Sequence, residues 1–359
     1  MQRIQTLGWS PFFESQWDPA SSGGLIPTRV VEEQRGSYRI HGEAGSWYAE
    51  VSGRLRHEAE TAGKALPCVG DWVAARIPDH PDTGTALIQR VFSRRTQLSR
   101  KDPDRRAVEQ VVAANVDTIF LAQSLNRDLN PRRLERYLAL LWESGAEPVV
   151  VLTKADLCVD PEPLVSEIED AAPGVRVHVT SALEPGGLDG LNPYLIPGKT
   201  VALVGSSGVG KSTIVNRLLG EDLQRIQEIR TDGRGMHTTT ARRLVLLPGG
   251  GMLLDTPGMR TVLLWEGEEG LSRAFEDIEA LAKECRFGDC AHGSEPGCAI
   301  QNALERGTLD ASRLQSYRKL LREARYHAAK SDVRLRMAEQ RRWRQIHREL
   351  RQRPDKRKI

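Results

Sequence analysis

A glycine-rich segment after an apolar run sets the strongest constraint on what this chain can fold into. Residues 201–204 read Val-Ala-Leu-Val, and residues 205–212 match the pattern G-x-x-x-x-G-K-[ST] in full. The residues that follow have helical spacing, so the segment is expected to connect a buried strand to the start of a helix. In such a loop, glycines let backbone N–H groups converge on phosphate oxygens, and the helix N-terminus adds favourable partial charge. The sequence therefore predicts a phosphate-binding loop in an α/β domain.

The residues of this loop have distinct expected roles towards a nucleotide and its Mg²⁺. Lys211 is expected to reach the β- and γ-phosphates, and the Ser212 hydroxyl is expected to bind Mg²⁺. The predicted nucleotide contacts come from Gly205, Ser206, Ser207, Gly208, Val209, Gly210, Lys211, Ser212 and Thr213.

Two short motifs upstream of the loop indicate which base is bound. The first follows the apolar run 148–152 and consists of Thr153, Lys154, Ala155 and Asp156. A carboxylate at Asp156 accepts hydrogen bonds from the N1–H and N2 amino groups of guanine, which adenine does not offer. Ser181 and Ala182 follow the next apolar run and resemble a motif whose backbone contacts the guanine O6.

Two further motifs lie downstream of the loop. Asp255 and Gly258 belong to a D-x-x-G sequence, in which the Asp contacts Mg²⁺ through water and the Gly N–H senses the γ-phosphate. Between the loop and this sequence, Thr239 is expected to bind Mg²⁺ and close over GTP, with Thr238 as the alternative.

The order of the motifs predicts a circular permutation. Ras-like GTPases run from the phosphate loop through the threonine switch and D-x-x-G to the guanine motif and S-A-x. This chain begins with the guanine motif and S-A-x and ends with D-x-x-G. The cyclic order is unchanged, and a permuted sheet keeps its spatial neighbours, so the nucleotide site is expected to survive.

The residue after D-x-x-G bears on catalysis. Ras-like enzymes carry there a Gln that orients the attacking water, whereas this chain has Met259. Intrinsic hydrolysis is therefore expected to be slow, or another group must position the water. His237, beside the switch threonines, is the candidate catalytic residue.

Three of the five cysteines lie close together with a histidine, in the order Cys285-x4-Cys290-x-His292-x5-Cys298. An odd number of cysteines with such a cluster does not suggest a secreted disulfide framework. Three thiolates and one imidazole form a closed tetrahedral site, which is typical of structural zinc. The sequence predicts one Zn²⁺ per chain.

The chain divides into several predicted parts. Residues 25–98 contain five short strands separated by turn residues, which fits an OB-fold barrel of the kind that often binds RNA, and an SH3-like barrel equally well. From residue 110, strands alternate with helical segments, which predicts a parallel sheet covered by helices. The predicted division is a flexible arm 1–24, an RNA-binding barrel 25–98, a linker 99–109, a GTPase domain 110–265, a helical zinc-binding domain 266–340 and a basic tail 341–359.

Composition places few limits on partners. The formal net charge is only +3, but the last nineteen residues are dense in Arg and Lys, which suits either phosphate binding or a solvated extension. No run approaches the roughly 20 apolar residues that span a bilayer. The N-terminus also lacks a signal-length apolar run, so the expected location is the cytoplasm, without a membrane partner. Nothing in the sequence demands an oligomer, and a monomer is expected.

Taken together, these motifs resemble the RsgA family of bacterial GTPases over nearly the whole chain from about residue 25. The resemblance implies an N-terminal OB-fold barrel, a central α/β circularly permuted P-loop GTPase domain and a C-terminal helical zinc domain. It also implies binding to the small ribosomal subunit and its rRNA late in maturation, with Mg²⁺ as cofactor and GTP hydrolysis stimulated by the subunit. Met236 departs from the family, which often has Lys at that position.

Three functions remain open at this point. The first is a GTPase stimulated by the ribosome, which His237 favours. The second is an RNA-binding assembly factor that uses GTP only as an affinity switch, which Met259 favours. The third is an ATPase or kinase acting on a small molecule, against which Asp156 argues.

Overall fold

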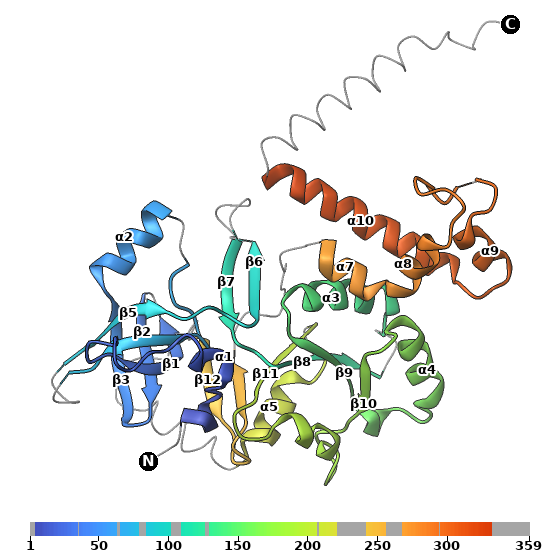
Figure 1. The fold of residues 1–359 in the computed structure, drawn as a ribbon. Helices are drawn as coiled ribbons and strands as arrows, with labels where there is room; N and C mark the ends of the chain where they lie inside the picture. The colour runs from blue at the N-terminus through green and yellow to red at the C-terminus, as the bar shows by residue number, and fades with distance from the viewer. Residues whose placement is uncertain are drawn as a thin grey trace, which may run out of the picture.

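In the computed structural model of the protein, three regions follow one another along the chain (Figure 1). The described residues are 4–34, 36–62, 65–78, 84–101, 109–125, 129–206, 208–220, 242–255, 268–293 and 295–331. Among the helices of these ranges, none combines the length and the apolar character needed to cross a membrane.

The first region is a closed five-stranded barrel. Its strands are β1 (Ile26–Gln34), β2 (Ser37–Gly42), β3 (Gly45–Val51), β4 (Trp72–Arg76) and β5 (Ala86–Val91). They pair in the order β1-β2-β3-β5-β4, and β4 pairs back to β1. Successive side chains of a strand face opposite sides, so Ile40 of β2 and Trp47 of β3 are buried while Arg39 and Tyr48 are exposed. The predicted five-stranded barrel is confirmed.

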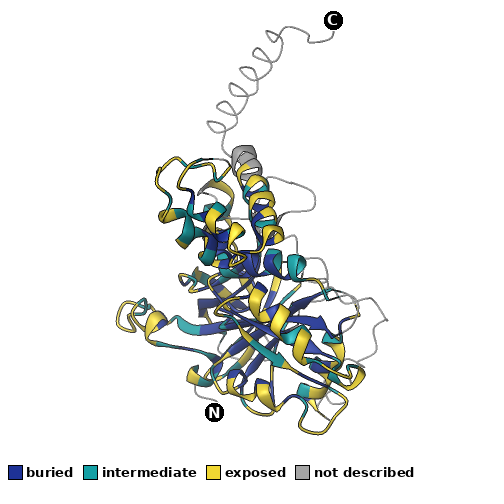
Figure 2. Cartoon of the chain, turned by 90° about the vertical axis from the view of Figure 1, so that its right-hand side faces the viewer, coloured by how far each residue is buried: buried dark blue, intermediate teal, exposed yellow. Residues whose placement is uncertain are grey.

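The second region is a mainly parallel sheet. Its strands are β8 (Thr118–Ser124), β9 (Glu147–Thr153), β10 (Arg176–Val179), β11 (Thr200–Gly205), β12 (Arg242–Leu246) and β13 (Met252–Asp255). They pair in the order β10-β9-β8-β11-β13-β12, and only β12 is antiparallel to its neighbour β13. Ile119 and Leu121 of β8 belong to one apolar cluster and Phe120 to another. Burial on both faces explains why residues 119–122 of β8 form a continuous apolar run, and Figure 2 shows the sheet strands as a buried layer.

Three helices cover this sheet: α3 (Pro131–Glu143), α4 (Glu162–Ala171) and α5 (Lys211–Leu219). α3 begins where the sequence requires it. The Asn130 side chain accepts a hydrogen bond of 3.0 Å from the Arg133 N–H, and Pro131 occupies the first helical position. Both features favour a helix start. Leu134, Leu138 and Leu141 then form the buried stripe that the sequence predicts.

The N-terminal segment corrects the expectation of a flexible arm over residues 1–24. Residues from Ile4 onwards form a short 3₁₀ helix, η1 (Ile4–Leu7), and α1 (Pro11–Glu14). Trp9 and Phe13 are buried, and the Trp9 ring lies edge-on to the ring of Trp72 in β4, with 4.8 Å between the ring centroids. The segment is polar on average, but its few aromatic side chains give it enough apolar area to dock.

The expected linker over residues 99–109 also differs from the structure. β6 (Gln97–Lys101) and β7 (Glu109–Ala114) pair as an antiparallel ribbon on either side of residues 102–108, which lie outside the described ranges. The charged, turn-like residues of 99–109 conceal the strand character of the ribbon, whose buried apolar residues Leu98, Val112 and Ala113 lie outside this range.

The barrel and the parallel sheet are joined directly. β1 pairs with β12, which makes one eleven-stranded sheet. Arg29 of β1 is buried near this junction, with 1% of its surface exposed. Its guanidinium donates to the carbonyl of Asn115 at 3.1 Å and to the Thr200 hydroxyl at 2.9 Å, and also to the carbonyl of Leu7. Burial lowers the pKa of Arg29 to about 10. One buried cation therefore links the N-terminal segment, the barrel and the start of β11.

The third region is helical. It contains α7 (Glu268–Ala274), α8 (Glu276–Lys283), α9 (Ala299–Glu305) and α10 (Ala311–Ser331). Arg313 of α10 is buried and pairs with Glu135 of α3 at 2.9 Å and with Asp277 of α8 at 2.8 Å. It also donates to the Ala171 carbonyl at the end of α4. Breaking a buried pair of this kind typically costs about 3–5 kcal/mol, so Arg313 holds the helical region against the parallel sheet's helices. The basic tail 341–359 lies outside the described residues.

Candidate nucleotide site and metal centre

The strands that carry the predicted motifs end at one edge of the parallel sheet. β11 lies between β8 and β13, and β9 and β10 follow on the far side of β8. All five strands are parallel, so their carboxyl ends meet at the same edge. In open α/β sheets, ligands bind at this edge.

The glycine-rich loop runs directly from β11 into α5. Gly205 has φ +143°, and a Cβ there would lie 2.3 Å from the Ala122 carbonyl oxygen of β8, so a side chain is excluded. Gly210 has φ +98° and precedes the first residue of α5, Lys211. The Lys211 ammonium donates to the carbonyl oxygens of Gly205 at 2.8 Å and Ser206 at 2.5 Å. The backbone of the loop therefore surrounds the ammonium group of Lys211.

The remaining predicted residues of this loop are placed as follows. Val209 is buried, whereas Gly208, Ser212 and Thr213 are exposed. Ser212 and Thr213 occupy the first turn of α5, the end of a helix that favours anions. Ser207 lies outside the described residues.

Thr153 connects the guanine motif to the phosphate loop. Its buried hydroxyl lies 2.5 Å from the Val209 carbonyl oxygen and 3.2 Å from that of Gln123. The structure therefore gives Thr153 a direct contact with the phosphate loop.

The guanine motif and the S-A-x motif come together although they are 25 residues apart. Lys154 adopts a left-handed conformation with φ +61° and turns the chain into the 3₁₀ helix η2 (Ala155–Leu157). The Asp156 carboxylate accepts a hydrogen bond of 2.7 Å from the Ser181 hydroxyl, and the Ala155 N–H donates to the Thr180 carbonyl at 3.1 Å. Ala182 follows, partly buried against the apolar cluster beneath.

The Ser181 side chain is a contact that the sequence does not predict. The motif indicates only a backbone role for this position, but the hydroxyl holds one carboxylate oxygen of Asp156. Because Asp156 is itself exposed, this bond fixes the orientation of a carboxylate that would otherwise rotate. A small hydroxyl residue two positions after the end of β10 is the signal that points to this contact.

Some predicted residues cannot be placed. Asp255 ends β13 beside β11, which brings its backbone to the motif edge. Gly258, His237 and Thr239 lie outside the described residues, as does Thr238.

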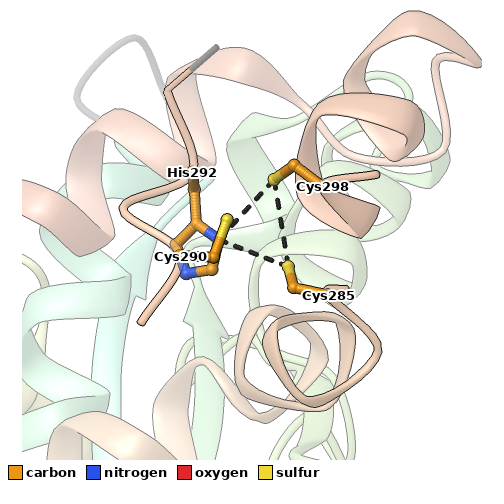
Figure 3. A group of neighbouring side chains, drawn as sticks. All are labelled: Cys285, Cys290, His292 and Cys298. Carbon is orange, nitrogen blue, oxygen red and sulfur yellow. Dashed lines mark hydrogen bonds between the residues drawn. The ribbon is translucent and has the colours of Figure 1, made fainter. Parts of the chain in front are cut away.

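The four predicted metal ligands converge in the helical region (Figure 3). Their ligand atoms all lie within 4.8 Å of one another. The Cys285 and Cys298 sulfurs are 3.9 Å apart, and the His292 Nδ1 lies 3.5 Å from the former and 3.7 Å from the latter. Zinc–sulfur bonds of 2.3 Å at tetrahedral angles place sulfurs about 3.8 Å apart. Cys285, Cys290, His292 and Cys298 thus fit a tetrahedral metal ion.

Backbone contacts shape this cluster. His292 has φ +57°, and its carbonyl accepts hydrogen bonds from Gln301 at 2.6 Å and Arg318 at 2.7 Å. Burial acts to raise the pKa of the Cys285 thiol, but hydrogen bonds from the backbone at the start of α9 and from neighbouring thiols outweigh it and lower the pKa. Burial and the neighbouring thiols raise the pKa of Cys290 to about 11, so of these two thiols only Cys285 favours the thiolate, which is the form that binds a metal. Cys68 and Cys158 lie apart from the cluster: Cys68 is buried, and Cys158 is partly buried against the apolar core.

Comparison with known proteins gives consistent results. The sequence profile described as RsgA GTPase matches residues 91–265. A relative from Opitutus terrae, named small ribosomal subunit biogenesis GTPase RsgA, is 44% identical over 352 residues, which is 96% of each chain. A relative from Lactiplantibacillus plantarum, named small ribosomal subunit biogenesis GTPase RsgA 2, is 46% identical over 88% of each chain.

Two solved structures resemble the fold. YjeQ from Thermotoga maritima matches with a TM-score of 0.63 and 27% identity, over 84% of this chain and 98% of that one. YloQ, described as a circularly permuted GTPase, matches with a TM-score of 0.60 and 24% identity over 86% and 98%, which supports the fold alone. With relatives this similar over nearly its full length, and with the permuted motifs meeting at one sheet edge, the chain belongs to the RsgA GTPase family and is a GTP-hydrolysing enzyme.

Proposed function

We propose that the chain binds the small ribosomal subunit through its rRNA and hydrolyses GTP to GDP and phosphate during late maturation, with hydrolysis stimulated by the subunit. The observation that carries the proposal is the meeting of the phosphate loop and the guanine motif at one sheet edge, in a chain whose relatives are named for small-subunit biogenesis. The proposed setting is the cytoplasm, with the chain acting as a monomer.

The barrel is proposed as an RNA-binding OB-fold. Its strand order β1-β2-β3-β5-β4, closed through β1 and β4, supports this choice over an SH3-like barrel. The parallel pairing of β3 with β5 also supports an OB-fold. The position of α2 (Gly53–Ala62) between β3 and β4 supports it as well. OB-folds bind oligonucleotides on the face formed around strands 2 and 3.

In the proposed reaction, the site's own residues orient GTP and its charges. Lys211 and the loop N–H groups hold the β- and γ-phosphates, and Asp156 reads the base. Ser212 and Thr239 are proposed to hold Mg²⁺, which would neutralise the charge that develops on the phosphates. His237 is proposed to orient the attacking water, because Met259 cannot form the necessary hydrogen bond. The cysteine–histidine cluster is proposed to hold one structural Zn²⁺, since four protein ligands leave no open position.

The experiment that tests this function measures GTP turnover by the purified protein, alone and with small ribosomal subunits. We expect strong stimulation by the subunit, and its loss in His237→Ala with GTP affinity unchanged. Tight guanine-nucleotide binding without stimulation would instead favour the switch-only function, to which Met259 points. Equal competition by ATP and GTP for the site would contradict both.

Base specificity provides a sharper prediction. Asp156→Asn removes the charged acceptor for the two guanine donors, and hydrogen bonds to charged groups contribute about 1.5–3 kcal/mol each. We expect GDP affinity to fall by roughly 10²-fold or more, while xanthosine diphosphate, whose 2-oxo group accepts from the Asn amide, binds more tightly than GDP. Fluorescence titration with both nucleotides measures this. Asp160→Asn, four residues further on, is the matched control and should leave GDP affinity unchanged.

A further inference from the structure

An exposed aromatic ring stands on the outer face of the barrel. Tyr48 lies in the middle of β3, and its neighbours Trp47 and Ala49 point into the barrel core. Tyr48 is 70% exposed, compared with 38% for Phe12 and 43% for Phe287. A large ring held this far into solvent on a regular strand gains little from burial, so its presence needs another reason.

The polar residues beside Tyr48 form a strip across two strands. Arg39 is its register partner on β2, and the Arg39 guanidinium lies over the Tyr48 ring at 5.6 Å from the centroid. One row further along, His41 pairs with Ser46, and their side chains are hydrogen bonded. Because the guanidinium lies over one face of the ring while the residue stays 70% exposed, much of the ring remains open to a ligand.

The charged side chains on this face indicate where an anionic backbone would lie. The carboxylates of Glu32 and Glu33 on β1 are neutralised by ion pairs with Arg243 and Arg242 of β12. Glu50 is exposed two residues beyond Tyr48 on the same face of β3. An anionic backbone is therefore expected to lie next to Arg39 rather than next to Glu50.

We propose that Tyr48 and Arg39 form a stacking site for an unpaired RNA base, with the adjoining phosphate next to Arg39. This inference rests on the proposed RNA-binding function and specifies where the barrel contacts RNA. Single-stranded RNA is recognised by stacking of splayed bases on Tyr rings and Arg planes, combined with cationic contacts to the backbone. A purely structural role for the cross-strand pair contributes only a few tenths to about 1 kcal/mol and does not require an open ring face.

The test uses the full chain and an eight-nucleotide single-stranded RNA that contains one 2-aminopurine, whose fluorescence falls when it stacks. Tyr48→Thr keeps the β-propensity of the strand and removes the ring, whereas Tyr48→Phe keeps the ring. We expect quenching and equal affinity for the wild type and Tyr48→Phe. Tyr48→Thr should lose the quenching and bind about tenfold more weakly. Phe12→Ala, another exposed ring outside the strip, is the control and should bind like the wild type.

Any of three results would overturn the inference. The first is unchanged quenching and affinity in Tyr48→Thr, and the second is no quenching in the wild type at saturating protein. The third is a Tyr48→Thr variant that binds this RNA normally but loses affinity for small subunits, which would assign the ring to a protein contact. GTP turnover by the wild type, measured with small subunits, separates failure of this inference from failure of the proposed function. If one of these results is found and the subunits still stimulate turnover, only the stacking site fails. If the subunits do not stimulate turnover, the proposed function fails.

Discussion

Lys211→Ala is expected to reduce GTP turnover by about 10²-fold or more. The ammonium group is held inside the phosphate loop by the carbonyl oxygens of Gly205 and Ser206, at 2.8 and 2.5 Å. From there it can bind the phosphate oxygens on which negative charge develops as the γ-phosphoryl group leaves. A single preorganised donor of this kind typically contributes a factor of about 10²–10³ to the rate.

Single-turnover hydrolysis at saturating GTP measures this effect on the chemical step. Lys199→Ala is the matched control, because Lys199 precedes the same strand at its other end and pairs with Asp117 at 3.4 Å, far from the loop. A rate for Lys211→Ala within twofold of the wild type would contradict the assigned role. Thermal unfolding of both variants checks that a lost rate does not reflect a lost fold.

The parts of the site that the sequence predicts are those where chemistry restricts the residue type. Gly205 is required because a Cβ would collide with the neighbouring strand, and that restriction leaves a visible glycine pattern. The cysteine–histidine cluster is local in sequence, so its spacing alone predicts the convergence of its side chains. The Ser181–Asp156 hydrogen bond was not predicted, since a hydroxyl can serve in many ways and the motif specifies only the backbone there.

The parts of the fold that the sequence does not predict depend on long-range packing. Trp9 and Phe13 have the i, i+4 spacing of a helix, but they lie in a short segment rich in Ser, Gly and Pro, where so short a pattern does not identify a helix. Their burial depends on a complementary surface around Trp72, which is far away in the sequence. The pairing of β1 with β12 has no local signal either, because any strand edge offers the same backbone donors and acceptors. Arg29 then takes part in a junction that composition cannot reveal.

Removing the metal ion proposed for the cysteine–histidine cluster is expected to unfold the segment around α8 and α9. These helices have only 8 and 7 residues, and isolated helices of that length are not stable in water. Structural zinc contributes about 10–16 kcal/mol of apparent binding free energy in small domains. Cys298→Ser removes one ligand at the start of α9, so we expect the variant to lose most of its zinc and the protection of the backbone amides from Glu276 to Glu305.

Metal content by mass spectrometry and amide hydrogen exchange together test this expectation. Cys158→Ser is the matched control: this cysteine is partly buried but lies outside the cluster, so the variant should retain about one zinc per chain and wild-type exchange. Unfolding should stop short of α10, because Arg313 holds that helix to α3 through Glu135 independently of the metal. Full zinc retention with unchanged exchange in Cys298→Ser would remove this cysteine from the ligand set. Loss of protection that extends through α3 would show instead that the cluster, rather than the Arg313 contacts, fixes the helical region to the sheet.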